Sequence, residues 1–181
     1  MDFITLTNKN DLTLIHDIII RPLKINKDDS GVLVETLRKD WEEIYGVGRE
    51  FVMQYFSITP PGIARDEDAW HYHPGGQEDR FLVVKGEIVV AIADLRSHSP
   101  TKNILNLFSM KSSEDPYILL VPKQTLHGFM VVSKEPAILL NFPTRLYDPK
   151  EEMRVPYAEA KITDASGKLF SWDTVRKNFG I

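Results

Sequence analysis

Short apolar runs separated by turn residues dominate this sequence and limit its fold more than any other feature. The runs have the length of strands rather than helices and are rich in β-branched and aromatic residues. Repeated strand-sized runs between turn signals are typical of an all-β sandwich or barrel. The expected strands span residues 15–20, 32–36, 52–58, 80–84, 87–93, 104–108, 117–121, 128–132 and 137–142.

Turn and helix signals complete this pattern. Pro-Pro-Gly at 60–62 and Pro-Gly-Gly at 74–76 break strands through their backbone preferences, and Lys85-Gly86 predicts a tight turn between two strands. Helical signal is limited to residues 40–45 and to 173–179, where Asp173 is the expected N-cap. The 181 residues show no internal repeat and no linker, so we expect one domain over residues 1–181 with short peripheral helices.

Charge and composition exclude several classes of partner and site. The net charge of −4, from 22 basic and 26 acidic residues, provides no basic surface for nucleic acid. The absence of cysteine rules out disulfides, thiolate metal sites and a cysteine nucleophile. The N-terminus lacks the basic start and apolar stretch of a signal peptide, and no run approaches the ~20 apolar residues that span a bilayer. We therefore expect a cytoplasmic protein with neither a membrane nor a nucleic-acid partner.

The polar residues of greatest interest gather around two histidines. His71 and His73 are two residues apart, so both point to the same face if the segment is extended. A carboxylate follows at Glu78 or Asp79, and the spacing does not decide which of the two shares the face of the histidines. His127 comes after a buried-looking strand and a turn. Three imidazoles and one carboxylate form a ligand set that suits Mn, Fe, Ni, Cu or Zn.

These residues resemble the two motifs of the cupin superfamily. The first motif is a pair of histidines, an acid and a glycine, and the second is a proline followed by a histidine. Gln124 stands where the second motif usually has glycine. The resemblance implies an all-β fold, a cupin jelly-roll β-barrel, which agrees with the strand pattern. The matching residues are His71, His73, Glu78 and Gly86 for the first motif and Pro122 and His127 for the second.

A closer resemblance, over most of the chain, is to the dTDP-4-dehydrorhamnose 3,5-epimerase family, whose members are cupins that work without metal. The segments that carry it are 31–36, 94–101, 122–129 and 146–149. The resemblance implies a nucleotide-linked keto sugar inside the barrel and a homodimer with the N-terminal segment exchanged or packed across. It also implies that His71 is the general base and that Arg80 stabilises the enolate oxygen. The expected substrate-binding residues are Glu35, Arg65 and His127.

Two positions depart from the family in the region expected to bind diphosphate. Ser30 and Asp68 stand where the family usually has arginines. Arg65 lies in the same loop as Asp68 and is the expected replacement for one of them. These departures leave a single epimerisation or a ketoisomerisation as open as the double epimerisation of the family.

The proton donor is a further departure. Asn141 falls near the family's proton-donating tyrosine, and an amide cannot donate a proton to carbon at useful rates. His73, which replaces a glutamine of the family, and Tyr147 are therefore the candidates for reprotonation. Asp173 could orient the base as a late aspartate does in the family, although its expected role is the helix N-cap.

The leading hypothesis is an epimerase or isomerase of a nucleotide-linked 4-keto-6-deoxy sugar in carbohydrate biosynthesis, with no cofactor. His71 would remove the proton beside the keto group, because a neutral imidazole with a pKa near ~6.5 suits this step. The alternative is a metal-dependent cupin oxygenase, isomerase or decarboxylase, and a third possibility is a sugar-binding cupin without catalysis. In the metal alternative, a divalent transition metal would bind His71, His73, Glu78 and His127. The first two hypotheses exclude each other, because a metal would occupy the lone pair that the base needs.

Overall fold

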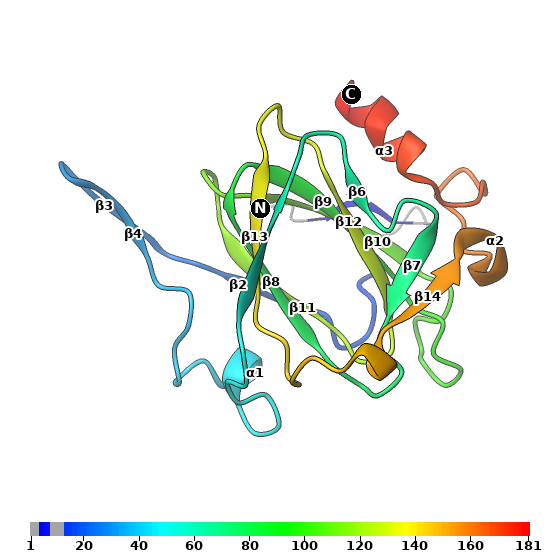
Figure 1. The fold of residues 1–181 in the computed structure, drawn as a ribbon, viewed down its shortest axis with the longest axis horizontal. Coiled ribbons are helices and arrows are strands. Elements are labelled where there is room, and N and C mark those ends of the chain that lie inside the picture. The colour runs from blue at the N-terminus through cyan, green and yellow to red at the C-terminus, as the bar shows by residue number, and fades with distance from the viewer. Residues whose placement is uncertain (1–3, 8–12) are drawn as a thin grey trace.

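Two antiparallel sheets face each other and form a barrel (Figure 1). The structure is a computed structural model that describes residues 4–7 and 13–181. The larger sheet contains, in order, β1 (Ile4–Thr7), β10 (Leu105–Lys111), β9 (Glu87–Ala93), β12 (Leu126–Val131), β7 (Ala69–Tyr72) and β14 (Met153–Pro156), and β6 (Ala64–Arg65) also pairs with β12. The smaller sheet contains β2 (Ile19–Pro22), β11 (Tyr117–Val121), β8 (Asp79–Lys85), β13 (Ala137–Asn141) and β5 (Tyr55–Thr59). The prediction of an all-β fold is confirmed.

A hairpin and a few short helices lie outside the two sheets. The hairpin, β3 (Ile25–Asp28) and β4 (Gly31–Val34), extends away from the barrel at the left of Figure 1. The helices are α1 (Glu42–Tyr45), α2 (Tyr157–Ala160), α3 (Trp172–Phe179) and the 3₁₀ turn Pro149–Glu151. Across residues 4–7 and 13–181, no helix is both long enough and apolar enough to cross a membrane.

Several elements differ from those expected from the sequence. Strands β9 and β11 have the expected bounds, whereas β1, β3, β6, β7 and β14 fall outside every expected strand. All five are short, and β7 and β14 carry polar side chains whose pattern does not reveal a strand. The expected N-cap role of Asp173 is wrong, because the N-cap is Ser171 and the Asp173 carboxylate accepts a hydrogen bond from Arg176 at 3.0 Å.

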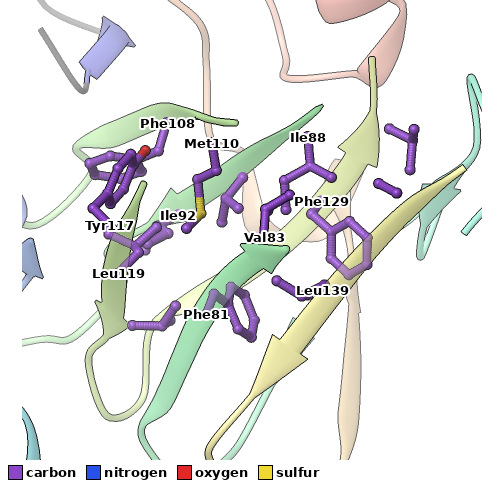
Figure 2. Close-up of a cluster of buried hydrophobic side chains, with 14 of the residues drawn as sticks. Phe81, Val83, Ile88, Ile92, Phe108, Met110, Tyr117, Leu119, Phe129 and Leu139 are labelled. Carbon is purple, nitrogen blue, oxygen red and sulfur yellow. The ribbon is translucent and has the colours of Figure 1, made fainter. Parts of the chain in front are cut away.

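The space between the sheets is filled by apolar side chains (Figure 2). Phe81 and Val83 alternate along β8, while Phe129 from β12 and Leu139 from β13 meet them from neighbouring strands. Alternation along a strand sends every second side chain inward, so these strands need only a short apolar run to form the core. Phe81, Phe129 and Leu139 also line a cavity beside the core, so the core forms part of its wall.

A second apolar cluster covers the outer face of β7 and fixes the direction of its side chains. Trp70 is fully buried there and stacks on Phe170 from the C-terminal segment, with ring centroids 4.7 Å apart. The neighbouring residue His71 lines the cavity inside the barrel. Because successive strand residues point to opposite faces, burial of Trp70 outside the barrel places His71 inside it.

The turn between β8 and β9 carries the chain from the smaller sheet to the larger one. Gly86 in this turn has φ +74°, in the region that favours glycine. A Cβ atom at this position would lie 2.8 Å from Ser133 Oγ and 3.0 Å from Ala137 Cα. The expected tight turn is therefore present, and both its backbone conformation and its close packing require glycine.

Candidate active site

The cavity inside the barrel brings together all three histidines singled out by the sequence. His71 comes from β7, His73 follows the end of that strand, and His127 comes from β12. His71 and His127 are directly opposite each other in the antiparallel pair of β7 and β12. The cavity is also lined by Tyr55, Arg65, Asp66, Asp79, Asn141 and Arg154.

His71 is held by a carboxylate in the loop before its strand. Its Nδ1 lies 3.4 Å from Asp66 Oδ2, and the Asp66 carboxylate also contacts the Arg154 guanidinium. Burial lowers the pKa of His71, the contact with Asp66 opposes this, and the neighbouring histidines lower the pKa further. The net shift is downward, so the ring is neutral at pH 7 and its Nε2 can accept a proton.

His73 and His127 are both anchored to the buried carboxylate of Asp79. Their Nε2 atoms lie 3.2 Å and 3.3 Å from Asp79 Oδ2, and Asp79 is only 2% exposed. Burial would raise the pKa of Asp79, but hydrogen bonds from the two histidines hold it well below its usual range. Burial alone would lower the pKa of His73, and Asp79 outweighs this so that the net shift is upward. The cavity therefore holds a carboxylate anion whose charge favours protonated imidazole beside it.

The other ring nitrogen of each of these two histidines is bound by the backbone. His73 Nδ1 donates to the carbonyl of Glu151 at 3.2 Å, and His127 Nδ1 donates to the carbonyl of Thr125 at 3.3 Å. Because a carbonyl only accepts hydrogen bonds, both Nδ1 atoms are protonated and both Nε2 atoms face Asp79. His73 Nε2 also lies 3.1 Å from His71 Nε2.

The three histidines form a compact set of nitrogen ligands. One ring nitrogen from each lies within 4.8 Å of the others, a spacing that could hold a transition metal. The prediction that Glu78 is the fourth ligand is wrong. Its carboxylate accepts two hydrogen bonds from Arg49, at 2.8 Å and 2.9 Å, on the other side of its strand. The acid next to the histidines is Asp79, which resolves the choice that the sequence left open.

Arg80 does not reach the cavity, so its expected role at the enolate oxygen is wrong. The side chain is fully buried on the face of β8 opposite to Asp79, with its guanidinium 4.4 Å from the ring centroid of Tyr45. It ties β8 to the segments around it through hydrogen bonds to backbone carbonyls. These carbonyls belong to Ile44, Arg49, Phe142 and Pro143.

Two other expected site residues also lie outside the cavity. Tyr147 is 64% exposed and does not line it, so the structure does not support its role in reprotonation. Glu35 lies just beyond the hairpin and pairs with Arg38. Arg65 does line the cavity, as expected, and its guanidinium donates to Thr59 Oγ1 at 3.1 Å.

Four cavity residues were not selected from the sequence as members of the site. Asp66, Arg154, Tyr55 and Asn141 reach it from the loop before β7 and from strands β14, β5 and β13. Arg154 is the cross-strand partner of His71, and Tyr55 is the cross-strand partner of Asn141. Sequence spacing contains no sign of such pairings, because they join residues that are more than eighty positions apart.

Comparison with known proteins identifies the family. The profile of the dTDP-4-dehydrorhamnose 3,5-epimerase family matches residues 12–168. The chain belongs to this family. It is therefore a sugar-nucleotide epimerase of the class that acts on 4-keto-6-deoxy sugars, to which dTDP-4-dehydrorhamnose belongs. The sequence-based prediction of the family and of its activity is confirmed.

Individual relatives agree with this assignment. The chain is 43% identical over 146 residues to the probable low-salt glycan biosynthesis epimerase Agl13 of Haloferax volcanii, covering 79% of this chain and 88% of that protein. A dTDP sugar isomerase from Desulfovibrio desulfuricans superposes with a TM-score of 0.73 at 25% identity, over 88% of this chain and 92% of that one. An epimerase from Legionella pneumophila, solved with dTDP-4-keto-L-rhamnose, gives 0.71 at 28% identity, over 83% and 78%. The predicted cupin-type barrel is confirmed by these likenesses.

We predict that Arg80→Lys destabilises the fold without removing a catalytic group. One ammonium cannot replace the planar donors that reach four carbonyls, so the free energy of unfolding should fall by about 3–5 kcal/mol. Denaturant unfolding measures the loss, and the matched control is Arg176→Lys at a partly exposed ion pair. Unchanged stability together with a large fall in kcat would instead indicate that Arg80 takes part in catalysis.

We predict that Asp66→Asn lowers kcat by ~10²–10⁴-fold with little change in KM, because an amide no longer stabilises the protonated ring of His71. With His71 as the base expected from the sequence, which acts only when deprotonated, kcat of the wild type should fall as the pH drops through the lowered pKa of His71. Loss of Asp66 removes the contact that raises this pKa, so the acid limb should move to still lower pH. The exposed Asp68→Asn is the control, and equal pH profiles for Asp66→Asn and wild type would contradict the assignment.

Proposed function

We propose that this protein epimerises a nucleotide-linked 4-keto-6-deoxy sugar by removing the proton from the carbon next to the keto group with His71. The observation that carries this proposal is the geometry of His71. Asp66 contacts its Nδ1, and its Nε2 lies inside the cavity among the other imidazoles. A neutral imidazole fixed by a carboxylate is suited to take a proton whose loss is eased by enolate formation.

The oxygen of the developing enolate would be stabilised by imidazole rather than by arginine. The raised pKa of His73 favours a protonated ring that can donate to the keto oxygen. Its Nε2 is 3.1 Å from the Nε2 of His71, so the keto oxygen and the adjacent C–H bond can lie over neighbouring rings. His127 contributes a second Nε2 to the same wall. A protonated His73 ring in a partly water-excluded cavity would stabilise the negative charge that develops in the transition state.

The nucleotide part of the substrate needs cations at the cavity, and two arginines are placed to supply them. Arg65 is exposed and lines the cavity from β6, in the loop where the sequence suggested a diphosphate contact. Arg154 lines it from β14 and also contacts Asp66. Guanidinium groups bind phosphate oxygens through paired donors. We propose Arg65 as the main diphosphate ligand.

We also propose that the protein acts in the cytoplasm.

The decisive experiment follows solvent deuterium during incubation with dTDP-linked 4-keto-6-deoxyglucose. The wild type should place deuterium on the carbon beside the keto group and form an epimer. His71→Asn should lose both activities by at least ~10³-fold, because no other group in the site is positioned as the base. His98→Asn, an exposed histidine outside the cavity, is the matched control. A wild type that neither exchanges nor epimerises would overturn the proposed function.

Removing or adding metal in the same experiment distinguishes the proposed metal-free mechanism from the metal-dependent alternative. Chelator-treated protein should keep its activity, and excess Ni²⁺ should inhibit it by occupying the Nε2 lone pair of the base. Inhibition should weaken in His73→Gln, which lacks one of the three clustered nitrogens. Activity that disappears with chelation and returns with metal would instead support the hypothesis of a metal-dependent enzyme.

We also propose that the protein works as a homodimer that pairs through its hairpin. Val32 and Leu33 on β4 are 67% and 62% exposed, on an arm that extends away from the barrel (Figure 1). Neighbouring exposed apolar side chains on a projecting strand pair are typical of a protein contact surface.

The double variant Val32→Asp/Leu33→Asp should shift the protein from dimer to monomer in sedimentation or light scattering. Charged side chains would then have to be buried in the contact, which opposes pairing. Leu146→Asp, at another exposed apolar position, should leave the dimer intact. A monomeric wild type, or a dimer that survives the double substitution, would contradict the hairpin as the contact.

A further inference from the structure

Inversion at carbon requires two groups on opposite sides of the sugar. The base removes a proton from one face of the carbon, and the planar enolate must then receive a proton on the other face. His73 cannot supply that second proton, because its Nε2 lies beside that of His71, 3.1 Å away. Tyr147 lies outside the cavity. Both residues expected to reprotonate the sugar are therefore poorly placed for inversion.

We propose that Tyr55 is the proton donor, and that its hydroxyl delivers the proton to the face of the enolate opposite to His71. The proposal rests on the proposed function and names a further catalytic residue for it. Tyr55 lies at the start of β5, in the smaller sheet, and lines the same cavity as His71. His71 lies on β7, in the larger sheet. Base and donor thus come from different sheets of the barrel.

Hydrogen bonds around Asn141 determine where the Tyr55 proton points. Asn141 Oδ1 accepts from the backbone N–H of Arg80 at 3.1 Å, and its Nδ2 donates to Asp79 Oδ1 at 2.8 Å. These two contacts fix the orientation of the amide. The same Nδ2 also donates to the Tyr55 hydroxyl at 2.8 Å.

An amide nitrogen only donates, so the phenol oxygen is the acceptor in this contact and its own O–H is directed elsewhere. Within residues 13–181, no hydrogen bond from the Tyr55 hydroxyl to a protein acceptor is present. A side chain that is held by its oxygen while its proton remains available can donate to a bound substrate. Asn141 thus positions the donor, although it cannot itself protonate carbon.

The electrostatics agree with this geometry. Burial first, and then the charge of Asp79, raise the pKa of Tyr55 to about 12. The phenol is therefore protonated at neutral pH, which is the form that a donor needs before the reaction.

The proposed steps balance in protons and electrons. The C–H bond breaks, its proton goes to His71 Nε2, and its electron pair forms the C=C bond of the enolate while the keto oxygen becomes negative. The enolate carbon then forms a bond to the Tyr55 proton on its other face as the O–H bond breaks, and the keto group is restored. His71 gives its proton to water and Tyr55 regains one from water, so no oxidant or other co-reactant is used.

The test separates exchange from inversion with dTDP-linked 4-keto-6-deoxyglucose in D₂O. Tyr55→Phe should lower epimer formation by ~10²-fold or more, whereas deuterium exchange at the same carbon should stay within about threefold of wild type. His71 can still remove the proton, exchange it with solvent and return deuterium to the original face. The expected product is therefore labelled substrate of unchanged configuration.

The controls distinguish this role from a structural one. Tyr147→Phe should change neither activity, and His71→Asn should lose both. If the wild type epimerises and Tyr55→Phe still epimerises at a similar rate, the donor assignment is overturned while the proposed function stands. Equal loss of exchange and epimerisation in Tyr55→Phe would overturn it as well, because a donor acts only after proton removal. A wild type without either activity would overturn both proposals.

Discussion

The buried carboxylate of Asp79 is the interaction on which the site depends. A charge with 2% exposure is tolerated only when its oxygens are satisfied, and here four side chains do so. His127 belongs to the larger sheet and His73 follows a strand of it, while Asn141 and Asp79 belong to the smaller one. Gln77 supplies the fourth contact, at 2.8 Å. One anion therefore joins the two sheets at the cavity, raises the pKa of His73 and orients the amide that holds Tyr55.

Three successive residues of the chain have different surroundings, one in the cavity and two outside it. Asp79 points into the barrel, whereas Glu78 and Arg80 on either side point away from it and hold the surrounding segments. A register shift of one residue would place the arginine in the cavity and the aspartate outside. The cupin motif alone does not determine this register, since it is compatible with an acid at either position. The partners decide it, because Arg49 is available to Glu78 and the histidines are available to Asp79.

Much of the fold and part of the site were predictable, and the difference has a physical basis. Alternation of side chains and turn residues predicted most central strands and put His71 and His73 on one face, because these signals are local. His127 was joined to them through the resemblance to the second cupin motif. Asp66 and Tyr55 were missed because they reach the cavity through pairing between distant strands and through a loop. Arg80 was misplaced for a related reason. The family resemblance puts Arg80 where relatives have a lysine near the sugar oxygens, whereas its carbonyl partners, such as Ile44 and Phe142, are backbone groups that a sequence does not mark.

The placement of the proposed base and proton donor on separate sheets would give the apolar core a part in stereochemistry. Exchange with solvent needs only the wall that carries His71, but inversion needs both walls at a fixed separation. That separation is set by side chains such as Phe81, Phe129 and Leu139, which pack between the sheets and border the cavity. Close packing transmits changes of volume to the surrounding backbone. The ratio of epimer to labelled substrate of unchanged configuration would then depend on how the core packs. Residues that never touch the sugar would help to determine which stereoisomer is released.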